Sequence, residues 1–134
     1  MPMQSTIELR DLRLVTDIGT YGPDDVEPEA HILDLVLTVD PRLIMIKEDG
    51  MAHVFDYDPL IAKIDALAQD GHYETQERLM TRIVAACAAS PEINAVEVAL
   101  SKTPVSRGTG VLGVRLKVDA HELANLRRGS DQGS

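Results

Sequence analysis

Residues 96–104 read VEVALSKTP and say most about the fold. Aliphatic residues alternate there with small or polar ones, a period of two that predicts a half-buried β-strand. Pro104 has no N–H to donate to a sheet, so strand pairing is expected to end near it. Lys102 therefore lies where a rigid sheet passes into a loop, a good place to hold an amine against a substrate. A solvated surface charge is the plainer interpretation of such a lysine.

Apolar patterns on either side predict an α+β domain with the element order ββααββ. The first of the other strands shows a phase slip that suggests a bulge. Asp58-Pro59 is typical of a helix start. The expected strands span residues 6–15, 31–39, 95–101 and 111–118, and the expected helices residues 58–69 and 75–89. This order predicts a four-stranded antiparallel sheet with two helices on one face.

The chain length predicts one domain, with residues 1–120 as its body. Residues 121–134 are polar and are expected to form a partly disordered C-terminal tail. The second strand, residues 31–39, is apolar on nearly both faces, so both of its faces are expected to be covered. Open sheet edges favour pairing between subunits, and a homo-oligomer that closes several sheets into a barrel is predicted.

Composition excludes several classes of function. The formal net charge of −9 argues against nucleic acid and anionic membranes as partners. The sequence contains no run of about 18 apolar residues, the length that a membrane-spanning helix needs. One cysteine, Cys87, fits a reducing cytosol, so a cytoplasmic location is expected. Cys87 is expected to be a core thiol.

The four histidines, namely His31, His53, His72 and His121, lack the spacing of metal ligands. They are expected to be scattered surface or edge residues.

Tyr57 and Glu77 each lie at a predicted helix start. Tyr57 follows Phe55-Asp56 directly before the first helix, and Glu77 lies in the first turn of the second. Packing explains such a tyrosine, and the favourable helix dipole explains such a glutamate, when each is considered alone.

Taken together with Lys102, these segments resemble the dihydroneopterin aldolase family and its close relatives, the dihydroneopterin triphosphate epimerases. The likeness covers residues 5–118 and includes "IG" at 18–19, "LDL" at 33–35, "DY" at 56–57, "YETQERL" at 73–79 and "SKTP" at 101–104. The resemblance implies the tunnelling fold, whose subunits assemble into tetramers or octamers with pockets between them. It also implies a small pterin substrate, and neither a cofactor nor a metal.

The resemblance also implies roles for individual residues. Glu77 anchors the pterin, with the backbone N–H of Gln76 as a further contact. Lys102 handles protons in a retro-aldol cleavage of 7,8-dihydroneopterin within folate biosynthesis, and Tyr57 is its partner from an adjoining subunit.

Asp24 is expected to position water, and Tyr21 and Phe55 are further candidates for substrate contact. Asp24 stands where the family usually has glutamate, and this difference leaves two alternatives open. One is a 2′-epimerase of dihydroneopterin or its triphosphate. The other is a non-catalytic pterin-binding oligomer.

Overall fold

The computed structural model describes residues 3–132. Its elements are β1 (Ser5–Leu14), β2 (Ala30–Val39), α1 (Asp58–Ala68), α2 (Gln76–Ala88), β3 (Ile93–Thr103), β4 (Leu112–Val118) and α3 (Ala120–Gln132). The four strands form one antiparallel sheet in the order β1-β2-β3-β4. The predicted α+β class and the four-stranded antiparallel sheet are confirmed.

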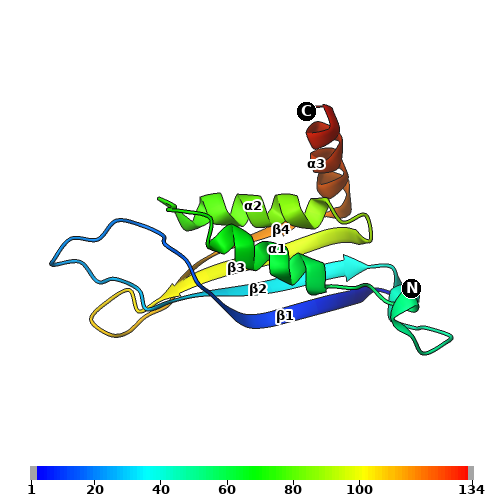
Figure 1. Ribbon diagram of the computed structural model, residues 1–134, viewed down its shortest axis with the longest axis horizontal. Coiled ribbons are helices and arrows are strands. Elements are labelled where there is room, and N and C mark those ends of the chain that lie inside the picture. Colours follow the sequence, from blue (N-terminus) through cyan, green and yellow to red (C-terminus); the bar gives the residue numbers. More distant parts are fainter. Residues whose placement is uncertain (1–2, 133–134) are drawn as a thin grey trace.

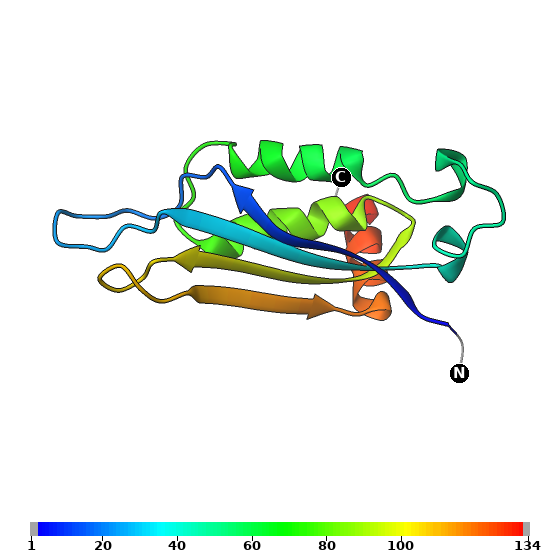
Figure 2. The same ribbon diagram turned by 90° about the horizontal axis from the view of Figure 1, so that it is seen from below.

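The core lies between one face of the sheet and the helices α1 and α2 (Figures 1 and 2). Leu33, Leu35 and Leu37 alternate along β2 and are all buried on this face. From the helices, Ile64 and Ile83 are fully buried against them. With few aromatic residues in the chain, aliphatic side chains form most of this core.

The phase slip predicted in β1 is a real irregularity of the sheet. The register between β1 and β2 shifts between Leu9 and Leu12. Asp11 lies within this bulge in the left-handed region, with φ of 57°. Its N–H donates to Oδ1 of Asp34 at 2.7 Å, which satisfies a group that the interrupted ladder leaves unpaired.

The C-terminal segment differs from the prediction. A polar tail was expected from His121, but residues up to Gln132 form α3 instead. Leu123 anchors this helix because its side chain is fully buried in the core. Arg127 donates to the carbonyl oxygens of Ala88 and Ser90 at 2.6 and 2.7 Å.

Residues 3–132 therefore form three α-helices where the sequence predicts two helices. In Figure 1, α3 stands at the end of α2 and points away from the sheet. Residues 133 and 134 of the expected tail lie outside the described residues.

The second face of the sheet carries no helix within residues 3–132 (Figure 2). Ile32 and Val36 of β2 point to this face and are half-buried. Charged side chains surround them, including Glu97 and Arg115, which form an ion pair at 3.1 Å. The sequence predicts that both faces of β2 are covered, but within the described part of this single chain only one of them is.

Candidate functional site

One end of the sheet brings together most of the residues predicted to act. It is the end where β2 begins and β3 finishes, and where the chain enters α2 (Figure 1). Glu29 donates its N–H to the carbonyl of Thr103 at 2.9 Å, which ties the loop before β2 to the end of β3. Gly19 and Tyr73 are joined by a backbone hydrogen bond of 2.7 Å, which ties the segment after β1 to the approach to α2. We call this the Lys102 end.

Lys102 lies on the helix-covered face of the sheet, because it is two residues after the buried Leu100 and alternate residues of a strand share a face. It is half-buried and lies opposite His31 of β2 and Leu112 of β4. The strand pairing ends at Thr103, as Pro104 predicts. Its amine therefore lies on the inner side of the sheet. A lysine that served only as a solvated surface charge would not need this position.

The first turn of α2 presents polar groups at the Lys102 end. The Thr75 hydroxyl accepts the N–H of Arg78 at 3.2 Å and caps the helix. The N–H groups of Gln76 and Glu77 keep no acceptor within the helix. Within residues 3–132 the exposed Glu77 carboxylate forms no hydrogen bond or ion pair. A free carboxylate beside free N–H groups suits a planar ligand that both donates and accepts hydrogen bonds.

The side chain of Gln76 is buried, and its Oε1 atom has no hydrogen-bond partner among the described residues. The sequence predicts a role only for the backbone of this residue. A polar position at the start of a helix that faces the core is the signal by which its side chain could have been found.

His31 is the residue that the sequence prediction missed. It was expected at the surface or an edge, but it is 7% exposed and lies directly opposite Lys102. Its Nδ1 is 3.0 Å from the hydroxyl of Thr16. Burial, and secondarily the charge of Lys102, lower the pKa of His31. Its alternation with Leu33 and Leu35 along β2 was the available signal that it points inward.

The other three histidines are exposed, as predicted. His72 lies between Asp17, at 3.1 Å, and Glu74, at 3.3 Å, and its hydrogen bond to Asp17 is the main cause of a raised pKa. Cys87 is fully buried, and burial raises the pKa of its thiol to about 12, which confirms the predicted core thiol. Among residues 3–132, no three metal-ligating side chains gather into a group.

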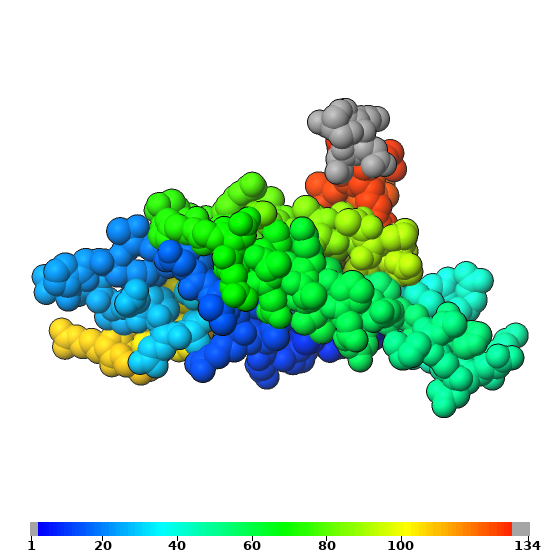
Figure 3. All heavy atoms as spheres, viewed as in Figure 1, coloured from blue at the N-terminus to red at the C-terminus, as the bar shows by residue number. Residues whose placement is uncertain are grey.

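The loop between β1 and β2 projects beyond the Lys102 end (Figures 1 and 3). Within it, the carboxylate of Asp25 accepts the N–H of Gly22 at 2.7 Å. Asp24 is exposed, and no hydrogen bond holds its carboxylate within the described part of the chain.

Tyr21 packs back against Gly19. A Cβ at Gly19 would lie 2.9 Å from the Tyr21 hydroxyl oxygen, and φ there is +88°, so glycine is required. Tyr21, Glu27, Glu29 and His31 line a pocket of about 350 Å³.

Tyr57 and Phe55 lie at the opposite end of the sheet, where α1 begins (Figure 1). Tyr57 directly precedes α1 and is 48% exposed. Phe55 is buried in the core at 7% exposure. A single chain therefore does not bring these two aromatic residues to Lys102.

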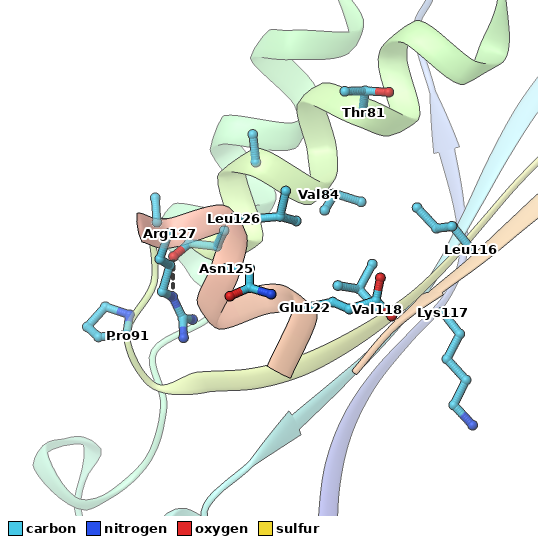
Figure 4. Close-up of a pocket in the computed structure, with 13 residues that line it drawn as sticks. Thr81, Val84, Pro91, Leu116, Lys117, Val118, Glu122, Asn125, Leu126 and Arg127 are labelled. Atoms are coloured by element: carbon cyan, nitrogen blue, oxygen red, sulfur yellow. Dashed lines mark hydrogen bonds between the residues drawn. The ribbon is translucent and has the colours of Figure 1, made fainter. Parts of the chain in front are cut away.

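A larger groove, of about 880 Å³, lies between α2, β4 and α3 (Figure 4). Its lining is mainly apolar and includes Val84, Leu116 and Leu126. None of the predicted site residues contributes to it. The groove flanks β4, whose outer edge no strand of residues 3–132 pairs.

The sequence of this chain matches a protein-family model over residues 7–117, and that family is described as dihydroneopterin aldolase. The chain belongs to the dihydroneopterin aldolase family. The resemblance found from the sequence is thereby confirmed. No curated protein matches the chain.

Solved structures of dihydroneopterin aldolases share the fold of this chain. A putative dihydroneopterin aldolase from Vibrio cholerae superposes with a TM-score of 0.73 at 19% identity, covering 86% of this chain and 97% of the other. The Escherichia coli dihydroneopterin aldolase in complex with neopterin gives 0.71 at 19% identity, with coverage of 84% and 97%. The Burkholderia thailandensis enzyme bound to guanine gives 0.68 at 23% identity, with coverage of 85% and 89%.

These likenesses concern the dihydroneopterin aldolase fold. The family match also supports a pterin-related activity for this member. None of its helices within residues 3–132 has the length and apolar character needed to cross a membrane.

Proposed function

We propose that this chain cleaves 7,8-dihydroneopterin by a retro-aldol reaction, giving 6-hydroxymethyl-7,8-dihydropterin and glycolaldehyde for folate biosynthesis. The observation that carries this proposal is the Lys102 end itself. There, an inward-facing amine shares one end of the sheet with a helix start that offers a free carboxylate at Glu77. The family match supports the same chemistry.

The pterin ring is held first. The Glu77 carboxylate accepts hydrogen bonds from the two adjacent N–H donors at the 2-amino-4-oxo edge of the pterin. The backbone N–H of Gln76, free at the start of α2, donates to the same edge. Positive potential at the helix start suits a negatively charged group at this position.

The reaction then needs little more than proton movement. Lys102 favours loss of the proton from the 2′-hydroxyl, through a water molecule that Asp24 positions. The bond between C1′ and C2′ breaks, C2′ leaves in glycolaldehyde, and the dihydropterin ring accepts the electron pair. Protonation at C1′, assisted by the Tyr57 phenol, gives the hydroxymethyl product. No metal or cofactor takes part in these steps.

We further propose that the working unit is a homo-oligomer, a tetramer or an octamer. Tyr57 lies at the opposite end of the sheet from Lys102, so the phenol must come from an adjoining subunit. Within residues 3–132, no strand pairs with the outer edges of β1 and β4, and no helix covers the second face of the sheet. Both features are consistent with a closed barrel of several sheets.

A second candidate is epimerisation at C2′, in which the aldehyde recombines with the ring intermediate on its other face. The Asp24 carboxylate favours it, because this side chain is exposed and no hydrogen bond fixes its carboxylate within the described residues. The pocket beside His31 has three carboxylates, from Asp17, Glu27 and Glu29, against one arginine, Arg13. This charge balance favours an uncharged hydroxylated side chain over a triphosphate.

Incubation of the purified protein with 7,8-dihydroneopterin tests the proposal. We expect release of glycolaldehyde in equal amount to 6-hydroxymethyl-7,8-dihydropterin. Recovery of the 2′-epimer alone would identify an epimerase. Tight pterin binding without any product would identify a non-catalytic binding oligomer.

A further inference from the structure

Two buried side-chain atoms within residues 3–132 lack a hydrogen-bond partner, His31 Nε2 and Gln76 Oε1. Both belong to elements that meet at the Lys102 end. Buried polar atoms in folded proteins are almost always paired, so an unpaired one at a candidate site calls for a partner, and a bound ligand can supply it. Gln76 already belongs to the proposed pterin-binding turn, whereas His31 has no role so far.

His31 is held firmly in one orientation. Thr16 engages its Nδ1 at 3.0 Å, and β2 pairs with both β1 and β3 at this residue. Burial and the neighbouring Lys102 lower its pKa, so the ring is neutral near pH 7. A neutral ring offers either a donor or an acceptor at Nε2, according to the bond that Nδ1 makes. A ligand hydroxyl can pair with either, because it both donates and accepts.

The surroundings of His31 define what such a ligand is. Lys102 lies directly across the strands, and His31 also lines the pocket of about 350 Å³ together with Tyr21. If Lys102 acts on the 2′-hydroxyl, the rest of the hydroxylated side chain lies next to Lys102. His31 pairs with Lys102 across the sheet, so it is the buried polar group of the sheet nearest to this ligand side chain.

Resting on the proposed function, we propose that His31 binds the hydroxylated side chain of the pterin through Nε2 and selects pterins that carry this side chain. His31 then determines specificity, while Glu77 binds the ring that all pterins share.

Binding of two oxidised pterins to the whole protein tests this, without any need for turnover. Neopterin carries three hydroxyls on its side chain, and 6-methylpterin carries none. In His31→Asn, the shorter amide can still reach Thr16 but leaves nothing at Nε2. We expect neopterin affinity to fall about three- to tenfold in this variant, the size of one lost neutral hydrogen bond, with 6-methylpterin affinity unchanged.

His31→Gln, which carries a polar group at about the place of Nε2, should restore most of the preference for neopterin. His121→Leu, a change at an exposed histidine, is the matched control and should alter neither affinity. If His31→Asn does not fold, as judged by circular dichroism, His31→Leu takes its place.

Equal loss of both affinities, or no loss of either, would overturn the role of His31 and leave the proposed function standing. A wild-type protein that binds neither ligand would overturn the proposed function and this inference with it.

Discussion

The two ends of the sheet are built very differently. At the Lys102 end, backbone hydrogen bonds tie the loop before β2 to β3 and the segment after β1 to the approach to α2. At the other end, residues 40–57 contain two short 3-10 helices, Pro41–Leu43 and Met51–His53, and neither buries a residue. Tyr57 closes this segment with about half of its surface exposed.

This difference teaches how the proposed site divides between subunits. Under the proposed function, the end that positions the ring and the amine is tied together by hydrogen bonds within one chain. The end that supplies the phenol would be completed by another copy. Each chain would then contribute two half-sites to different pockets.

Replacement of Lys102 should have the largest effect. Lys102→Met keeps the apolar stem and removes the amine, so cleavage should slow by about 100- to 10,000-fold, the range for loss of a proton-transfer group. Neopterin affinity should change little, because Glu77 remains. Glycolaldehyde release measures the first quantity and fluorescence titration the second. Lys117→Met, on the other face of the sheet, is the matched control and should stay active.

If the half-sites are shared, mixing Lys102→Met with Tyr57→Phe, each expected to be impaired alone, should restore part of the activity. Lys102→Met and Tyr57→Phe subunits, unfolded and refolded together, form some pockets with both an intact lysine and an intact tyrosine. Each variant refolded alone lacks such pockets. A mixture no more active than its parts would contradict the division between subunits.

Replacement of Glu77 should have the next largest effect, and on binding. Glu77→Gln loses a charge-assisted pair of hydrogen bonds, so affinity should fall about 10- to 100-fold for neopterin and 6-methylpterin alike. Isothermal titration calorimetry measures both. Glu74→Gln changes an exposed neighbour that pairs with His72 and should bind normally. A loss confined to neopterin would mean that Glu77 holds the side chain and not the ring.

The smallest expected effect is on the pH dependence of the free energy of unfolding. Two histidines at the Lys102 end, His31 and His72, are expected to change it in opposite directions. The pKa of His31 is lowered in the folded chain. As pH falls through the unfolded value of about 6.5, the unfolded state takes up a proton that the folded state refuses, so the free energy of unfolding decreases. Each unit of pKa difference corresponds to about 1.4 kcal/mol.

His72 acts with the opposite sign. Its pKa is raised by Asp17, so its contribution to stability is present at low pH and is lost as pH rises through the pKa of the folded state. Urea unfolding between about pH 5.5 and 7.5 measures both. His31→Asn should flatten the decline toward low pH, and His72→Gln should steepen it. A steeper decline in His31→Asn would show that His31 is protonated in the folded chain.

Local patterns in the sequence predicted most of the fold. Alternation in residues 96–104 and the helix start at Asp58-Pro59 depend on neighbours a few positions apart, and their physical effects are local. The phase slip near Asp11 was visible for the same reason. The third helix was not, because its residues are largely polar and one buried leucine, Leu123, together with the contacts of Arg127, holds it in place.

By itself, the sequence determined the α+β class and the family, and it predicted the candidate site residues, because periodicity and motifs are written along the chain. Only the tertiary structure decided that Lys102 faces inward opposite a buried His31, and that Tyr57 lies at the far end of the sheet. Those facts depend on which strands pair and in which register. A pairing between Lys102 and a residue 71 positions away leaves no mark in either local pattern.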